Sequence, residues 1–244
     1  VIALLVTPVL GLLVLAAPFL AGRPMQEATV NRWVQALMVV HLLAAVTMAF
    51  GVAIWGAMTV DLGRWYGDAE YALEVALRAD ATGAVAVVVI ALLSLVVLRF
   101  AEQYLHQEAG HLRFFAISLL AVACLDVIAL AATLDILFMG WELLGLCSFL
   151  LIAFFHEQEA TVARGLRAIY SYRTADLGLL FALILMHASG RSTGLGGASF
   201  TSGAASGVIG ALLLLTASGK AGLVPFSAWL SRCAEGPTPS TALF

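Results

Sequence analysis

The sequence predicts an all-α integral membrane protein, a polytopic bundle of transmembrane helices. Its 244 residues are 62% apolar and 11% charged, whereas a soluble domain is about half apolar and about a quarter charged. Apolar stretches of about 20 residues, the length that crosses the hydrocarbon core of a bilayer, recur along the chain. The net charge of −3 comes without a basic cluster, so nothing indicates a nucleic-acid-binding protein.

Seven stretches are long and apolar enough to span a membrane. They comprise residues 1–21, 34–57, 81–100, 114–133, 136–155, 164–187 and 206–225. An eighth helix is expected to begin near Pro239. The chain starts at Val1 inside an apolar run and ends at Phe244 soon after a proline, so we expect a fragment of a longer protein. No basic segment precedes the first stretch, which favours a spanning helix over a signal peptide.

Two connections between the expected helices are longer than the others. Residues 58–80 contain acidic residues and alternate partly as strands do, which predicts a short hairpin or interfacial segment outside the membrane. Residues 188–205 are rich in Gly and Ser and are expected to be a flexible connector. Their "GLGGAS" run is not a phosphate-binding loop, because no lysine follows it and no βαβ pattern surrounds it.

The arginines in the connections predict the orientation of the helices. Alternate connections, beginning with the one after the first helix, contain Arg23, Arg32, Arg99, Arg113, Arg164, Arg167 and Arg232. The intervening connections contain Arg64, Arg78 and Arg191. Because cytoplasmic loops have the excess of basic residues, the first set is expected in the cytoplasm and residues 58–80 outside. The expected localisation is the bacterial inner (plasma) membrane, with multiple passes.

Charged residues inside the apolar stretches are the candidate functional residues, because a charge at the bilayer centre costs about 2.5–3.5 kcal/mol on insertion scales. Glu142, in "LFMGWELLGLCSFLLIAFF", is interpreted as a buried proton carrier or the partner of a cation, with a helix-end carboxylate as the alternative. Arg173 and Asp176 are three residues apart and share a helix face. They form either a structural ion pair or a pair that tunes the charge on a neighbouring helix.

Lys220 is the only lysine in the chain. Gly219, Gly222 and Pro225 weaken the helix around it, and a broken helix with an ionisable group at membrane depth is a recurring device of transporters. A lysine in such surroundings releases its proton at modest cost. The alternative is a side chain that extends to the membrane interface.

Asp126, in "AVACLDVIALAA", is a fifth charged candidate within an expected helix and is either a hydrogen-bond partner for another helix or part of the path. Asp135 is expected at a solvated turn, and His41 and His187 are expected to be packing residues. The three cysteines are scattered, without the spacing of a zinc or iron–sulfur site. No redox cofactor motif is present, so no cofactor or metal is expected in this chain.

Three blocks resemble the antiporter-like, proton-conducting membrane subunits of complex I, most closely the L-type (subunit 5) branch. They read "RFFAISLLAVACLDVIALAATLDILFMGWELLGLCSFLLIAFF", "RAIYSYRTADLGLL" and "GKAGLVPFSAWLSRCAEGPTPSTALF". The resemblance implies two inverted five-helix repeats, each with one discontinuous helix, of which this chain holds the leading helices and most of the first repeat. Residues 1–110 are then N-terminal transmembrane helices with a hairpin, and residues 111–244 a proton-conducting transporter domain truncated at helix 8.

By resemblance, Glu142 matches the helix-5 glutamate of the family and Lys220 the lysine on its broken helix, which together form a switchable ion pair. Arg173 and Asp176 match the Arg and Asp of helix 6, and Arg167 matches a basic residue just before them. The resemblance implies proton or cation translocation by a non-redox subunit of an NADH:quinone oxidoreductase-type complex. The implied partners are other membrane subunits, the lipid bilayer, and protons or Na⁺.

The sequence also departs from the family pattern. Ala175 stands where the family commonly has Gly, and Asp126 stands where an apolar residue is expected. The His expected after "EGPTP" is absent. These departures leave open an alternative, an ion-gradient-coupled membrane subunit of an inorganic-carbon uptake complex or a Mrp-type cation/proton antiporter.

Overall fold

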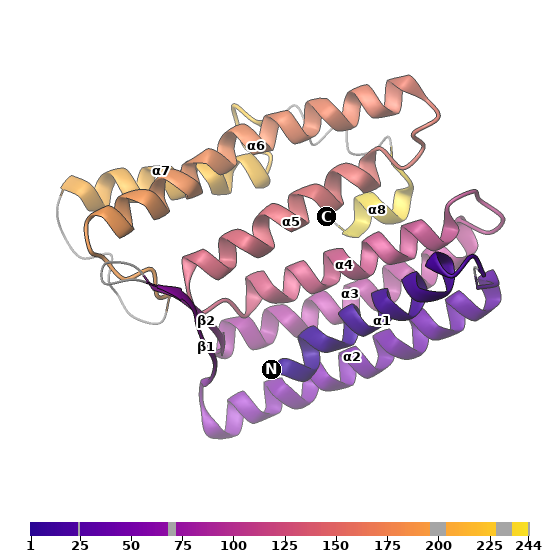
Figure 1. Cartoon of the computed structure of the whole chain (residues 1–244), viewed down its shortest axis with the longest axis horizontal. Coiled ribbons are helices and arrows are strands. Elements are labelled where there is room, and N and C mark those ends of the chain that lie inside the picture. Colours follow the sequence, from indigo (N-terminus) through magenta and orange to yellow (C-terminus); the bar gives the residue numbers. More distant parts are fainter. Residues whose placement is uncertain (24, 68–71, 196–203, 228–235, 244) are drawn as a thin grey trace.

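Apolar helices lie side by side along the long axis of the molecule, and a two-stranded hairpin lies at one end of them (Figure 1). The computed structural model describes residues 1–23, 25–67, 72–195, 204–227 and 236–243. In chain order, the elements are α1 (Ile2–Leu20), α2 (Glu27–Trp55), β1 (Met58–Gly67), β2 (Ala72–Ala79), α3 (Ala81–Tyr104), α4 (His111–Ala129), α5 (Leu134–Ile152), α6 (Glu159–Ala188), α7 (Ala204–Lys220) and α8 (Thr238–Leu243). Helices α1 to α6 are each long and apolar enough to cross a membrane, which confirms the predicted polytopic helical bundle. The seventh predicted span, residues 206–225, is shorter than expected, because its apolar helix ends at Lys220.

Capping residues set two of the helix boundaries. The Asp80 side chain accepts a hydrogen bond from the Gly83 N–H at 2.9 Å at the start of α3. The Thr133 hydroxyl accepts one from the Ile136 N–H at 3.3 Å at the start of α5. These bonds satisfy backbone donors that a helix N-terminus leaves without partners. Thr133 therefore begins α5 where the apolar pattern alone predicts the end of the preceding helix, and α4 ends earlier, at Ala129.

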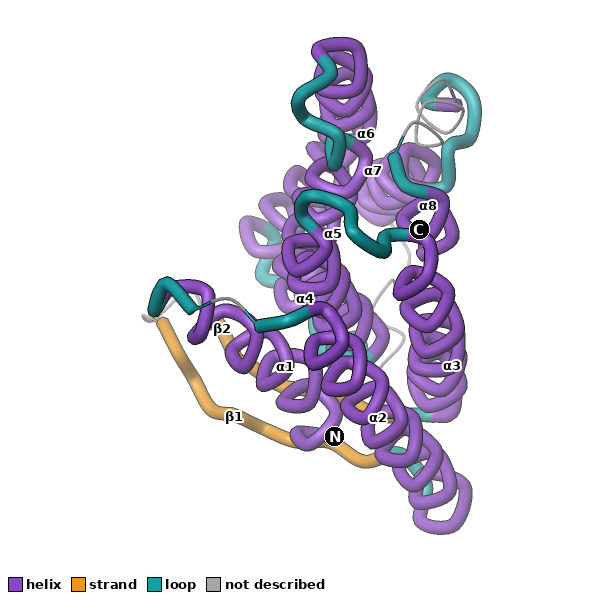
Figure 2. The backbone as a smooth tube through the Cα atoms, turned by 90° about the vertical axis from the view of Figure 1, so that its right-hand side faces the viewer, coloured by secondary structure: helices purple, strands orange, loops and turns teal. Residues whose placement is uncertain are grey.

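The hairpin expected between α2 and α3 is present as the antiparallel pair of β1 and β2. Figure 2 shows both strands (orange) crossing the direction of the helices. The Arg78 N–H of β2 donates to the Leu130 carbonyl at 2.7 Å, and the Ala132 N–H donates to the Ala76 carbonyl at 3.2 Å. The hairpin is thus joined by backbone hydrogen bonds to the turn between α4 and α5.

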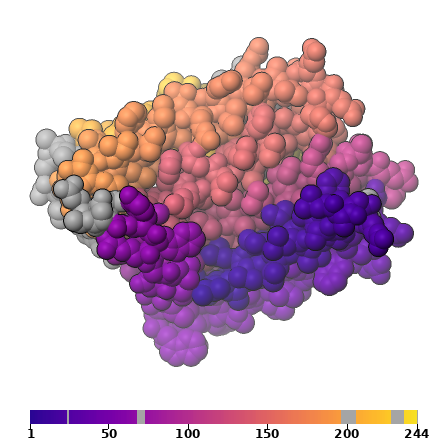
Figure 3. Space-filling model, in the orientation of Figure 1, coloured from indigo at the N-terminus to yellow at the C-terminus, as the bar shows by residue number. Residues whose placement is uncertain are grey.

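The helices pack as two groups that share α5. Helices α1, α2, α3 and α4 contact one another, α5 packs against both α4 and α6, and α6 packs along α7. Figure 3 shows α1 (indigo) on the visible face of the molecule. Its side chains Leu10, Leu13 and Phe19 are each more than half exposed, as expected for a helix in contact with lipid. The second group, formed by α5, α6 and α7, contains the charged residues that the sequence singles out.

The predicted break near Lys220 is confirmed, because α7 ends at that residue. Gly222 has a φ of +63°, a left-handed conformation that commonly terminates a helix. The Leu223 N–H folds back to the Ser218 carbonyl at 2.9 Å and so satisfies one carbonyl of the last turn. The continuation of the chain over residues 228–235 lies outside the described residues.

Candidate functional site

Three adjacent helices bring the four principal charged residues into one region. Glu142 lies in the middle of α5, Arg173 and Asp176 lie in the middle of α6, and Lys220 is the last residue of α7. Helix α6 packs against both α5 and α7, and Figure 1 shows these three helices beside one another. Trp141, which directly precedes Glu142, contacts two of them, Asp176 and Lys220.

An ion pair joins the Arg173 Nη1 to the Glu142 Oε2 across the α5–α6 contact. The two side chains are 48% and 24% exposed. The spacing of three predicts a pair between Arg173 and Asp176, but the ion pairs of the described residues do not include one. Spacing places two residues on one helix face without choosing their partners, and here each of them takes a partner on α5.

Asp176 is almost completely buried, with 2% of its surface exposed. Its Oδ1 accepts a hydrogen bond from the Trp141 Nε1–H at 2.6 Å. Its Oδ2 has no hydrogen-bond partner within the described part of the chain. Since buried carboxyl oxygens normally have partners, Asp176 offers one acceptor position inside the helix bundle for a proton, a water molecule or a cation.

The Lys220 ammonium lies in a cage made by one carbonyl and two aromatic rings. Its Nζ donates to the Trp141 carbonyl at 3.3 Å and lies 5.1 Å from the Trp141 ring centroid and 4.8 Å from the Tyr172 ring centroid. A cation over an aromatic face is stabilised by about 0.5–2 kcal/mol. The Tyr172 hydroxyl donates to the Gly145 carbonyl at 2.7 Å, which fixes its ring. Gly145 leaves room for the ammonium, because a Cβ there would lie 3.2 Å from Nζ.

The direct ion pair expected between Glu142 and Lys220 does not occur among the described residues. The Glu142 carboxylate is held by Arg173, and the Lys220 ammonium contacts Trp141 and Tyr172 instead. The sequence identifies both groups as buried charges but gives no information on how α5 is rotated about its axis. That rotation turns Trp141, rather than its neighbour Glu142, toward the end of α7.

Small residues let α7 approach α6 closely enough to place Lys220. A Cβ added at Gly219 would lie 2.1 Å from the Ala175 Cβ, and one added at Gly178 would lie 2.5 Å from the Leu212 carbonyl oxygen. The Thr216 hydroxyl also donates to the Ala175 carbonyl at 3.0 Å. Small residues and interhelical hydrogen bonds of this kind are the usual basis of close helix packing in membranes.

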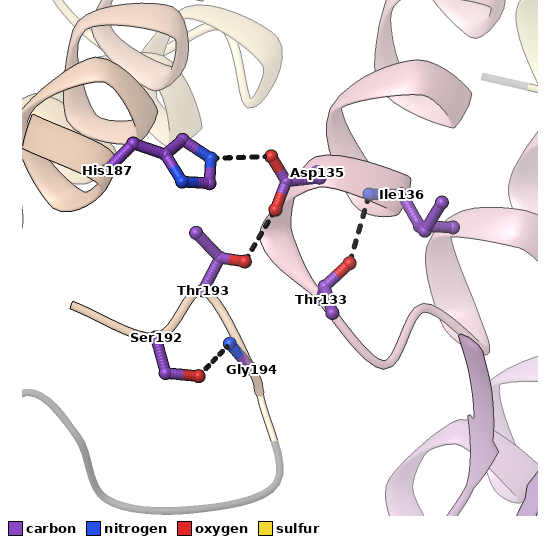
Figure 4. A network of polar contacts seen from close by, with 7 residues as sticks. All are labelled: Thr133, Asp135, Ile136, His187, Ser192, Thr193 and Gly194. Carbon is purple, nitrogen blue, oxygen red and sulfur yellow. Dashed lines mark hydrogen bonds and ion pairs between the residues drawn. The ribbon is translucent and has the colours of Figure 1, made fainter. Parts of the chain in front are cut away.

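Asp135 forms a separate polar network at the hairpin end of α5 (Figure 4). Its Oδ1 lies 2.9 Å from the His187 Nε2 at the end of α6, and its Oδ2 accepts a hydrogen bond from the Thr193 hydroxyl. The sequence predicts a solvated turn for Asp135 and a packing role for His187. Both expectations are wrong, because the connection after α6 folds back over the start of α5 and brings the two residues together.

Asp126 lies away from the α5–α6–α7 region. It faces His41 of α2, with 3.3 Å between the Asp126 Oδ2 and the His41 Nε2. His41 is therefore not a packing residue alone. The approach to α2 is close, but neither Asp126 oxygen has a hydrogen-bond partner within the described residues, so the choice between a hydrogen-bond partner and part of the path stays a prediction.

The site contains two functional candidates that the sequence analysis misses, Trp141 and Tyr172. Aromatic residues in an apolar helix are indistinguishable from ordinary packing residues by pattern. The usable signal is the position of Trp141 directly before a buried acid. The described residues contain no group of three or more His, Cys, Asp or Glu side chains placed to hold a metal ion.

The fold and the buried charges define an antiporter-like helical membrane protein. Two family models match the chain. Residues 131–244 match the transmembrane model described as NADH:quinone oxidoreductase/Mrp antiporter. Residues 65–115 match the model described as the N-terminus of NADH-ubiquinone oxidoreductase (complex I) chain 5. The chain belongs to this family of antiporter-like L-type (chain 5) membrane subunits.

Individual relatives agree with the family models. NADH-quinone oxidoreductase subunit L of Escherichia coli (strain K12) is 30% identical over 98% of this chain and 40% of its own length. NAD(P)H-quinone oxidoreductase chain 5 of Synechocystis sp. is 28% identical over 87% of this chain and 33% of its own length. The chain thus spans about a third to two fifths of these relatives. A chain of the Mrp complex from Dietzia sp. DQ12-45-1b has the same fold, with a TM-score of 0.79 at 23% identity over 99% of this chain and 26% of that one.

Proposed function

We propose that the chain translocates protons across a membrane as an antiporter-like, non-redox subunit of a quinone-oxidoreductase-type complex. The observation that carries the proposal is the grouping of an exchangeable amine, Lys220, and two carboxyl groups, Glu142 and Asp176, around Trp141. Ionisable residues within transmembrane segments are rare, and those that occur commonly mark ion or proton paths. The named relatives are subunits of quinone oxidoreductases, which supports other membrane subunits as partners.

Arg173 has a different role from Lys220 in this proposal. A guanidinium keeps its proton under all ordinary conditions, whereas an amine and a carboxyl group exchange theirs. Arg173 is thus a fixed positive charge that holds Glu142 while Lys220 rests in its aromatic cage. Movement of Glu142 from Arg173 to Lys220 stabilises the charged lysine, and its return to Arg173 favours proton release from Lys220.

The proposed ion is the proton rather than Na⁺. The Lys220 ammonium has three donors and no acceptor, so it repels a metal cation and cannot coordinate one. A neutral lysine, in contrast, accepts a proton directly. The proposed location is the bacterial inner membrane, in keeping with the bacterial relatives. Of the two alternatives, the relatives named above do not include an inorganic-carbon transporter, whereas the description of the matching family covers Mrp antiporters as well as quinone oxidoreductases.

The test is proton flux in liposomes that contain the full-length protein with its complex. Lys220→Ala and Glu142→Gln are each expected to lower the flux at least about tenfold, equivalent to about 1.4 kcal/mol on the barrier. Ser218→Ala, which removes a hydroxyl of the same helix that donates to the Leu215 carbonyl one turn earlier, is the matched control. Wild-type flux in both charge variants would overturn the proposal, and a flux that requires Na⁺ would overturn the choice of ion.

A further inference from the structure

A second pair of ionisable residues is sealed inside the leading group of helices. His41 is the middle residue of the long helix α2, and Asp126 lies in the last turn of α4. Both side chains are 0% exposed, and the Nε2 of His41 lies 3.3 Å from the Oδ2 of Asp126. Neither carboxylate oxygen and neither ring nitrogen makes an aligned hydrogen bond within the described residues. The two groups therefore approach each other closely without an aligned hydrogen bond.

Within the part of the chain that the structure describes, no further ion pair joins His41 or Asp126 to another group. Helix α1 contains no Asp, Glu, His, Cys, Lys, Arg or Tyr, and its Leu4 backbone lies beside the His41 ring. The ionisable residues of α3, Arg99, Glu102 and Tyr104, are all in its last turns, at the end away from the hairpin. On α4, the nearest titratable neighbour is the buried thiol of Cys124.

Several charges of the neighbouring elements have partners of their own. Arg78, near the end of β2, and Asp80, the N-cap of α3, lie 3.8 Å apart and pair with each other. On α5, Asp135 pairs with His187 and Glu142 pairs with Arg173, and Cys147 is a buried thiol. The charge of the His41–Asp126 pair must therefore be balanced within the pair.

This isolation determines how many protons the pair holds. With one exchangeable proton, the pair is neutral overall, either as imidazole with carboxylic acid or as imidazolium with carboxylate. Without that proton, it is a neutral imidazole beside a lone carboxylate, an uncompensated charge in a site that excludes water. An unpaired buried charge is strongly unfavourable. The closed bundle therefore retains one proton at this position.

The position of the pair also indicates where that proton enters and leaves. Asp126 lies one helical turn before Leu130, whose carbonyl accepts the hydrogen bond from the Arg78 N–H of the hairpin. The hairpin end of α4 is thus much nearer to the pair than the opposite end. A local opening between the hairpin and the α4–α5 turn admits water to Asp126 without separating the helices along their whole length.

We propose that His41 and Asp126 form a proton-binding site that exchanges with the hairpin side of the membrane. The site differs from the Glu142–Lys220 region in its helices, because its two residues lie on α2 and α4. The proposal goes beyond the proposed function, since occupancy by a proton is measured without any transport. The two groups titrate as one coupled unit rather than as independent residues.

The test is an infrared titration of the full-length protein in its complex, reconstituted into lipid. The difference between the wild-type and Asp126→Asn spectra isolates the carboxyl signal of residue 126. This signal is expected to change over a single transition as the pH is varied. His41→Gln is expected to move the midpoint of that transition by about one pH unit or more, because the partner of the carboxyl group is lost.

Ser118→Ala is the matched control, since Ser118 is another buried polar residue of α4 without a hydrogen-bond partner in the described chain. It is expected to leave the midpoint unchanged. A carboxyl signal that stays constant at every pH, or the same midpoint with and without the imidazole, would overturn the proposal. If Asp126→Asn does not assemble, the same comparison is made between wild type and His41→Gln with ¹³C-labelled aspartate. Loss of flux in Lys220→Ala has no bearing on this readout, so the two proposals fail separately.

Discussion

At the scale of single residues, Trp141 connects Lys220 of α7 with Asp176 of α6. Its carbonyl and its ring contact the Lys220 ammonium, and its indole N–H bonds to Asp176. Glu142, the next residue, is engaged with Arg173. Trp141 thus contacts both the Lys220 ammonium and the buried Asp176 carboxylate. The sequence predicts a direct ion pair between Glu142 of α5 and Lys220 of α7 instead.

The contributions of the Trp141 ring and its N–H are separable by two substitutions. Trp141→Phe keeps an aromatic face for Lys220 and removes the bond to Asp176, so proton flux is expected to fall about tenfold, since hydrogen bonds to charged groups contribute about 1.5–3 kcal/mol. Trp141→Leu also removes the ring and is expected to lower the flux by a further two- to fivefold, for a cation–π contact of about 0.5–1 kcal/mol.

Flux in reconstituted liposomes measures both effects. Met139→Leu, at an exposed position of the same helix, serves as the control and is expected to match the wild type. Equal flux for the wild type and Trp141→Leu would show that the cage has no part in the rate-determining step.

The sequence predicts the charged residues of this site better than it predicts their partners. Glu142 and Lys220 stand out because a charge in an apolar stretch is costly and therefore rare. Which side chains meet depends on the rotation of each helix about its axis and on the depth of its packing. Neither quantity is recorded in the spacing of residues along one chain, so the cage and the Arg173–Glu142 pair become visible only in three dimensions.

At the scale of elements, the close α6–α7 contact depends on glycine residues, which have no side chain to keep the helices apart. Gly219 of α7 lies directly against Ala175 of α6. In the sequence, Gly219 is expected to weaken the helix around Lys220. The structure gives it a second role, because even a methyl group at this position does not fit without moving the two helices apart.

Two glycine-to-alanine substitutions in α7 test this role with the same chemical change. Gly219→Ala is expected to destabilise the protein by about 1–3 kcal/mol, the usual cost of overpacking, because its Cβ would lie 2.1 Å from that of Ala175. Gly207 has no atom within 4 Å of an added Cβ, so Gly207→Ala is expected to be neutral or slightly stabilising through its higher helix propensity. Thermal unfolding in detergent measures the difference. Equal melting temperatures for the two variants would contradict close packing at Gly219.

At the scale of the whole molecule, the arginine distribution and the fold define one orientation. The structure places the hairpin and the turn between α4 and α5 at one end of the bundle, as Figure 1 shows. The connection between α3 and α4 lies at the opposite end. Counting basic residues predicts the second end to be cytoplasmic. The helix spans, the hairpin and this alternation follow from apolar length and turn residues, which is why the sequence predicts them well.

Thiol labelling of intact cells tests the orientation. In a background without native cysteines, Leu62→Cys on exposed β1 is expected to react with a membrane-impermeant reagent from outside. Glu108→Cys, exposed in the α3–α4 connection, is expected to react only after the membrane is permeabilised. Total labelling in detergent corrects for differences in reactivity. The reverse pattern would mean that the bundle is inserted the other way round.

Because Trp141 and Glu142 are adjacent in the sequence, rotation of α5 about its axis changes which of the two side chains faces α7. Successive residues in an α-helix project about 100° apart around its axis. The two side chains therefore address different neighbours at any one setting of the helix, Lys220 and Asp176 for one, Arg173 for the other. A turn of α5 that carries the carboxylate toward Lys220 carries the indole away from it. A rotation of α5 as a rigid helix would therefore exchange the contact of Lys220 with the Trp141 ring for an ion pair with Glu142.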